Sequence, residues 1–290
     1  MQTFSKPVVE LISQRYSCRT YLEEPIEHEL QRRLSEFADG LGPGPFGGRA
    51  RFQLVAAAEE DSKALRQLGT YGFIKSATGY LVGATQDGEE KLEDFGFLME
   101  KLVLFATDLG LGTCWLGGTF TKSSFAQKIA ARPDELIPSV AAVGYCARKP
   151  RAVDRLIRRG ADGDRRLPFE RLFFDERFAN PYSSATAGEY ALPLEMVRLA
   201  PSASNRQPWR MIRLDNRWHF YLQRTPGYRE SFLNRIFTQA DLQRVDMGIA
   251  MCHFELTARE QGLAGEWVKD DPGIDTPDEF TCYSATWLSS

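Results

Sequence analysis

Residues 200–210, with the sequence APSASNRQPWR, carry a dense set of groups suited to ligand binding. The two prolines cannot continue a helix or donate to a sheet, so a rigid loop is predicted between a helix at 192–199 and a strand at 209–214. Small side chains leave backbone N–H groups uncovered, and two amide side chains both donate and accept. These residues are Ser202, Ala203, Ser204, Asn205 and Gln207. The loop therefore suits the polar edge of a flat heterocycle, although a plain connector accounts for the composition equally well.

A second segment whose side chains could bind a ligand is RYSCR, residues 15–19, which follows a short helix predicted at 7–14. Arg15 and Arg19 lie four residues apart with the Ser17 hydroxyl between them. Two guanidiniums and a hydroxyl can hold a phosphate through charge-assisted, bidentate hydrogen bonds. The structural alternative is that basic groups at a helix end satisfy its last carbonyls.

Both segments resemble motifs of the nitroreductase family, the FMN-dependent NAD(P)H oxidoreductases. APSASNRQPW is similar to APSxxNxQPW, and RYSCRTY is similar to RRSVRxF, with Cys18 in place of the usual Val and Tyr21 in place of Phe. The resemblance implies that Arg15, Ser17 and Arg19 hold the phosphate, the ribityl chain and the pyrimidine edge of FMN. It also implies that the 200–210 loop contacts the flavin across a subunit interface. The contact residues would be Pro201, Ser202, Ala203 and Asn205.

The resemblance extends to GLGTCWLGGTF, residues 110–120, which follows an apolar helix predicted at 92–109 and contains a strand at 113–116. In the family, the backbone after this strand addresses flavin N5 and O4, which implies this role for Leu116, Gly117 and Gly118. A close turn is the steric alternative for the two glycines. No protein nucleophile is needed, because the chemistry of this family is centred on the flavin.

Residues 148–171 contain nine basic side chains with four acidic ones among them. A solvated connector of mixed charge is the simplest interpretation, and a nucleic-acid patch is the alternative. Arg165 and Arg166 resemble the Lys/Arg pair that adds to the phosphate site of nitroreductases.

Residues 42–47 match GxGxxG formally but do not fit a dinucleotide fingerprint. Such a fingerprint needs a strand before it and a helix after it. Here a helix predicted at 26–38 precedes the glycines and a strand at 51–57 follows them. A flexible loop is expected.

The two long apolar helices, predicted at 92–109 and 242–263, match each other at a constant offset of 152 residues. Eight of 22 ungapped positions are identical, and an acidic residue recurs at Asp108 and Glu260. The identical pairs are Asp94/Asp246, Gly96/Gly248, Met99/Met251, Leu104/Leu256, Ala106/Ala258, Gly110/Gly262, Leu111/Leu263 and Trp115/Trp267. This match indicates a duplicated unit. Helices that are apolar nearly all round are expected to be buried against each other.

The predicted fold is therefore α+β and nitroreductase-like: an internally duplicated pseudo-dimer with mostly antiparallel sheets, flanked by helices around two long buried helices. The first half, 1–185, carries RYSCR and GLGTCWLGG, and the second half, 186–290, carries APSASNRQPW. The two halves are expected to form one compact unit. Because the motifs are divided between the halves, we expect one FMN site per chain, complete in a monomer, although a homodimer is compatible with it.

The composition and charge of the chain argue against several classes of function. The chain has 290 residues, a net charge of −3 and five scattered cysteines. No apolar run approaches the ~20 residues needed to cross a bilayer, and no histidine or cysteine spacing fits a metal site. We expect a cytoplasmic protein with reduced thiols and no metal, membrane or nucleic-acid partner.

The expected function is an FMN-dependent NAD(P)H oxidoreductase of nitroreductase type. It would use NADH or NADPH to reduce small acceptors, nitroaromatic or quinone, by ping-pong hydride transfer. The alternative is a flavin-binding or flavin-free scaffold that has lost turnover.

Overall fold

The computed structural model describes residues 4–57, 65, 68–86, 88, 90–118, 120–148, 151–160, 165–227 and 240–290. In these residues the strands form two five-stranded sheets. The first has the order β1-β2-β5-β3, with β4 beside β2, and is antiparallel throughout. Its strands are β1 (Ala50–Ala56), β2 (Gly79–Gln86), β3 (Gly112–Leu116), β4 (Glu135–Leu136) and β5 (Val140–Gly144).

The second sheet has the order β6-β7-β8-β10-β9 and is antiparallel except for the β6–β7 pair. Its strands are β6 (Phe173–Asp175), β7 (Trp209–Leu214), β8 (Arg217–Gln223), β9 (Gly265–Val268) and β10 (Thr281–Ser289). β6 precedes the boundary predicted at residue 185, so the second sheet draws on chain from both predicted halves. We propose that the halves divide before β6.

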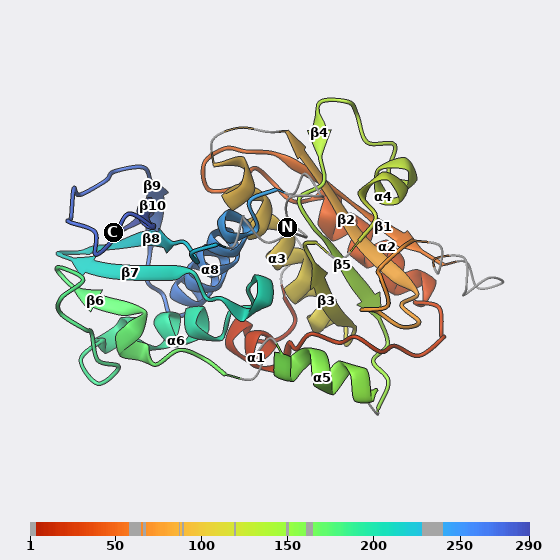
Figure 1. Cartoon of the computed structure of the whole chain (residues 1–290), viewed down its shortest axis with the longest axis horizontal. Coiled ribbons are helices and arrows are strands. Elements are labelled where there is room, and N and C mark those ends of the chain that lie inside the picture. The colour runs from red at the N-terminus through yellow and green to blue at the C-terminus, as the bar shows by residue number, and fades with distance from the viewer. Residues whose placement is uncertain are drawn as a thin grey trace.

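Two long helices, α3 (Lys91–Asp108) and α8 (Leu242–Glu260), lie between the two sheets (Figure 1). They cross at Gly96 and Gly248. A Cβ on Gly96 would lie 2.1 Å from the Val245 carbonyl oxygen, and a Cβ on Gly248 would lie 2.0 Å from the Glu93 carbonyl oxygen. Glycine is required at both positions because backbone meets backbone there. The two contacts are related by the 152-residue offset, so the crossing has pseudo-twofold symmetry.

The order of elements repeats on both sides of this crossing. In the first half α2 (His28–Asp39) is followed by β1, β2, α3, β3 and β5, and in the second half α6 (Ala191–Leu199) is followed by β7, β8, α8, β9 and β10. The corresponding strands also hold the same places in their sheets. The predicted internal duplication is therefore confirmed.

The N-terminal segment lies across both halves. α1 (Val8–Gln14) packs against α3, α6 and α8. The Glu260 carboxylate accepts a hydrogen bond from the Val8 amide at 2.7 Å, and the equivalent Asp108 accepts one from Ser5 at 2.6 Å. The first residue of α1 is therefore tied to the last residue of α8, and the segment just before α1 is tied to the last residue of α3.

The connector at 148–171 contains a helix, α5 (Ala152–Gly160), where an irregular solvated segment was expected. Asp154 on this helix is buried, accepts from the Arg151 amide at 3.0 Å and also accepts from the Thr20 hydroxyl. These contacts hold α5 against the segment that follows α1, and both helices lie toward the lower edge of the molecule in Figure 1. α4 (Lys122–Lys128) precedes β4. Among the helices of the described residues, none is long and apolar enough to cross a membrane.

Candidate functional site at the junction of the two halves

The RYSCR segment lies along β3. Ser17 forms a parallel bridge with Thr113, and the Cys18 amide donates to the Thr113 carbonyl at 2.9 Å. Burial raises the pKa of the neighbouring Cys114 thiol, while the positive charges of Arg19 and Arg15 act in the opposite direction. Both guanidiniums therefore lie near β3, together with the Ser17 hydroxyl.

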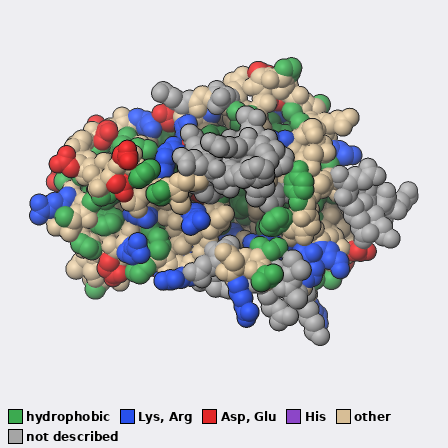
Figure 2. Space-filling model, in the orientation of Figure 1, with side chains coloured by type: hydrophobic (Ala, Val, Ile, Leu, Met, Phe, Trp, Pro, Cys, Tyr) green, Lys and Arg blue, Asp and Glu red, His purple; other side chains and the backbone are tan. Residues whose placement is uncertain are grey.

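Charge is unevenly distributed over the face shown in Figure 2. Basic side chains appear along the lower edge of the molecule, where Figure 1 places α1 and α5, and acidic side chains gather near β9 and β10.

The other end of β3 reaches α8. Leu116 is buried, and a Cβ on Gly117 would lie 2.4 Å from a methyl carbon of Leu242, the first residue of α8. The absence of a side chain at Gly117 thus allows the two halves to approach closely. The sequence had suggested only a close turn at this glycine. Gly118, the next residue, is half-buried.

The 200–210 loop is held in a strained conformation. Ser204, Asn205 and Gln207 have φ angles of 51°, 53° and 50°, in the left-handed region that costs a non-glycine residue ~1–2 kcal/mol. The Gln207 amide donates to the Ser202 hydroxyl at 2.8 Å, which stabilises this shape. Pro201 precedes the turn and is half-buried. Strain of this kind persists where surrounding contacts hold a loop in one geometry, often at ligand sites.

Asp246 fixes this loop to α8. Its buried carboxylate accepts from the Ala203 amide at 3.0 and 3.1 Å, and burial raises its pKa well above the usual range. Asp246 lies one helical turn after Leu242, so the same stretch of α8 contacts Gly117 of the first half and Ala203 of the second. Sequence reasoning placed neither Leu242 nor Asp246 in the site. The recurrence of Asp94 as Asp246 was the available signal.

The pair Arg165–Arg166 also meets the loop. Arg166 donates to the Asn205 side-chain oxygen at 3.0 Å and to the Leu199 carbonyl at 3.2 Å, while Asn205 donates to the Arg165 carbonyl at 2.9 Å. The Leu167 amide donates to the Gln207 side chain at 2.8 Å. The structure therefore brings together 165–166 and 201–207, and it uses the Asn205 side chain to hold Arg166.

Different side chains occupy the pseudo-symmetric counterpart of this junction. Lys269 stands 152 residues after Gly117, and its ammonium lies 3.3 Å from Glu90, the counterpart of Leu242. The same ammonium lies 5.1 Å from the centre of the Phe46 ring. Phe46 belongs to the loop 42–48, the counterpart of the 200–210 loop, which Asp94 holds through the Phe46 and Gly48 amides at 2.9 and 2.6 Å. That loop is thus fixed to α3, where a flexible one was expected.

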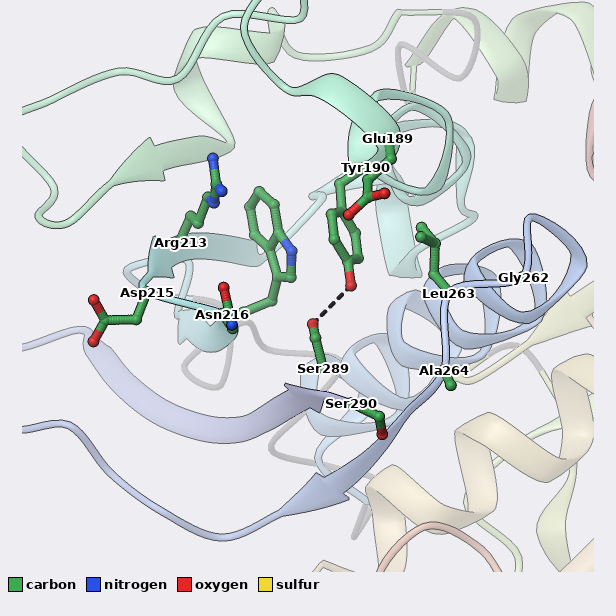
Figure 3. Close-up of a pocket in the computed structure, with 11 residues that line it drawn as sticks. Glu189, Tyr190, Arg213, Asp215, Asn216, Gly262, Leu263, Ala264, Ser289 and Ser290 are labelled. Atoms are coloured by element: carbon green, nitrogen blue, oxygen red, sulfur yellow. Dashed lines mark hydrogen bonds between the residues drawn. The ribbon is translucent and has the colours of Figure 1, made fainter.

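A separate cleft of about 330 Å³ lies at the other end of α8 (Figure 3). Its walls include Tyr190 and Trp218, whose ring centroids lie 5.4 Å apart, and Arg213, which pairs with Trp218 between β7 and β8. The Tyr190 hydroxyl is 2.7 Å from that of Ser289 (Figure 3). The cleft is also lined by Gly262, which lies just beyond the C-terminus of α8. Because α8 has 19 residues, ~28 Å of helix separate this cleft from the junction.

Comparison with known proteins identifies the fold. Residues 7–258 match the family described as "Putative TM nitroreductase". The chain belongs to this nitroreductase family. It is therefore an oxidoreductase of nitroreductase type, with the internally duplicated architecture described above. Comparison with curated proteins found no match.

Solved structures of similar fold include a putative nitroreductase from Thermotoga maritima MSB8. It is 21% identical with a TM-score of 0.61, and the alignment covers 99% of this chain and 96% of that one. An FMN-dependent nitroreductase from Clostridium difficile R20291 is 22% identical, with a TM-score of 0.40, over 49% of this chain and 89% of that one. A putative nitroreductase from Desulfovibrio desulfuricans, solved in complex with FMN, is 22% identical, with a TM-score of 0.40, over 52% and 95%.

Proposed function

We propose that the protein binds one FMN per chain at the junction of the two halves and acts as an NAD(P)H oxidoreductase. Bound FMN would supply the redox chemistry, accepting hydride from NADH or NADPH and passing electrons to a nitroaromatic, quinone or similar small acceptor in a ping-pong cycle. The chain's own residues bind and orient the reactants, and none is required as a nucleophile.

The donor set fits this cofactor. Arg15, Ser17 and Arg19 lie together beside β3 and provide two guanidiniums and a hydroxyl for the phosphate and ribityl chain. Arg19 also offers positive charge to the pyrimidine edge, where negative charge develops on reduction. The backbone of Leu116, Gly117 and Gly118 provides hydrogen-bonding groups for the opposite edge of the ring. Pro201, Ser202, Ala203 and Asn205 would cover the ring from the second half, with Arg165 and Arg166 behind them.

The observation that carries this proposal is the double role of α8. One helical turn, Leu242 to Asp246, abuts Gly117 and holds the Ala203 amide. Motifs that are about 85 residues apart in the chain therefore meet within one molecule, as a fused pseudo-dimer requires. Lys269 and Phe46, which stand at the mirrored position, support a single site per chain.

Paired substitutions at pseudo-symmetric positions test the proposal. Asp246→Ala removes the acceptor that holds the candidate ring-binding loop, whereas Asp94→Ala removes the same acceptor at the mirrored position. We expect Asp246→Ala to weaken FMN binding by ~0.5–1.5 kcal/mol, the range for an ordinary hydrogen bond, and Asp94→Ala to leave it unchanged. FMN fluorescence quenching measures affinity and stoichiometry, and far-UV circular dichroism checks folding. Equal losses in both variants, or two FMN per chain, would contradict the site.

Oxidation of NADH and NADPH with and without a quinone separates an enzyme from a scaffold. An oxidoreductase consumes the nucleotide faster when acceptor is added, whereas a scaffold that has lost turnover binds FMN without doing so. Mixing Arg15→Ala and Asn205→Ala proteins should restore no binding, because each chain builds its own site. Recovery in the mixture would show that the motifs meet between chains.

A further inference from the structure

The RYSCR segment contains a second reactive feature, because Cys18 lies beside Cys146. A Cβ built on Gly112 would be 1.9 Å from the sulfur of Cys146 and 3.3 Å from that of Cys18. The two sulfurs can therefore be no farther apart than the sum of those distances, and each thiol shifts the pKa of the other. The Cys18 thiol donates to the Thr20 carbonyl at 3.3 Å. Both cysteines are free, and Cys18 is buried whereas Cys146 is partly exposed. Backbone contacts fix the pair, since Tyr21 and Cys146 form an antiparallel bridge.

The surroundings divide the roles of the two thiols. The neighbouring Cys18 thiol lowers the pKa of Cys146; burial opposes this effect and the Tyr16 phenol adds to it. The neighbouring Cys146 raises the pKa of Cys18, and burial acts in the same direction. Cys146 is thus the more accessible and more ionised sulfur, and the thiolate is the form that attacks a disulfide.

We propose that Cys18 and Cys146 are a redox-modification site that forms an intramolecular disulfide by exchange with a low-molecular-weight disulfide such as glutathione disulfide. The Cys146 thiolate attacks one glutathione sulfur, which breaks the glutathione S–S bond and releases one glutathione thiolate. Cys18 then loses its proton and attacks the sulfur of Cys146, which releases the second. The two protein thiols are oxidised, glutathione disulfide is reduced, and the two protons pass to the released thiolates.

Disulfide formation would act on the candidate FMN site. A disulfide requires an S–S distance near 2.05 Å, shorter than any contact between two free thiols. Cys18 stands between Ser17 and Arg19, and its amide is tied to Thr113 at 2.9 Å. Drawing its sulfur toward Cys146 would therefore strain the backbone that positions Ser17 and Arg19 beside β3. This consequence for FMN rests on the proposed function, whereas the disulfide itself does not.

Peptide mapping of the full-length protein tests the site. After incubation with glutathione disulfide and alkylation, we expect a Cys18–Cys146 cross-link, three reactive thiols of the five after unfolding, and reversal by dithiothreitol. Cys146→Ser and Cys18→Val should lose the cross-link, and Cys282→Ser, which removes an exposed thiol, should keep it. Stable glutathionylation of Cys146, or a cross-link to Cys114, would overturn the proposal.

A second measurement tests the coupling to the flavin. Oxidised wild-type protein should bind FMN at least several-fold more weakly than the reduced protein, whereas Cys18→Val should not respond to glutathione disulfide. Unchanged affinity despite a complete cross-link would overturn the coupling. Failure of every form to bind FMN would reject the proposed function and leave the mapped disulfide standing.

Discussion

Gly248→Ala is the most direct test of the helix crossing that joins the two halves. The added Cβ would lie 2.0 Å from the Glu93 carbonyl oxygen and 2.7 Å from the Phe97 amide nitrogen. Carbon and carbonyl oxygen normally approach to ~3.3–3.6 Å, so α3 and α8 must separate by about 1 Å. Both obstacles are backbone atoms of a buried helix, and a change of side-chain rotamer cannot relieve the contact.

The expected cost follows from this geometry. Overpacking a core costs ~1–3 kcal/mol, and the upper end applies because the obstruction is backbone. Alanine's higher helix propensity offsets about 1 kcal/mol, which leaves a net loss of about 2 kcal/mol or more. Gly96→Ala should cost a similar amount. The double variant should cost less than the sum, since one separation of the helices relieves both contacts.

Urea unfolding followed by far-UV circular dichroism measures these free energies. Gly160→Ala is a matched control, because Gly160 also lies in a helix but a Cβ there would meet nothing within 4 Å. We expect this control to be neutral or slightly stabilising. If Gly248→Ala were as stable as the control, the close crossing and its pseudo-symmetry would be refuted.

Two further outcomes follow from buried and partly buried polar groups. Glu100→Ala should destabilise the protein by ~3–5 kcal/mol in urea unfolding. The reason is that this fully buried carboxyl group contacts His253 at 2.9 Å and accepts a hydrogen bond from the Trp115 indole at 2.8 Å. A loss of stability below ~1 kcal/mol would contradict that role. Hydrogen bonds from Arg51 hold the pKa of Glu135 at about 2, below its ordinary 4.5, so the stabilisation is present above pH 4.5 and is lost as pH falls toward 2. Glu135→Gln should therefore lower the free energy of unfolding at pH 7 by about 2 kcal/mol, after allowance for the exposure of Arg51. It should also reduce the loss of that free energy between pH 5 and 2. If the variant lost stability with falling pH as the wild type does, the ion pair would be contradicted.

Elements with a strong local signal were predicted closely. The strand expected at 209–214 is β7, and the helix expected at 92–109 is α3, shifted by one residue. β4 is too short, at two residues, to give any periodicity. α5 was missed because its many charged residues indicated a solvated connector. β6 was missed because a three-residue strand is recognisable only through its partner β7.

The sequence alone determined the duplication, the division of the motifs between the halves and the burial of the two long helices. These properties are recorded in residue identity and periodicity along a single segment. Tertiary structure decided which groups meet: Asp246 with Ala203, Arg166 with Asn205, and Cys18 with Cys146. It also placed Lys269 beside Glu90 and Phe46, at the pseudo-symmetric counterpart of the junction. Such contacts join residues far apart in the chain, and their geometry depends on how α3 and α8 cross. Periodicity reports that a face is buried, but it does not identify the partner that buries it.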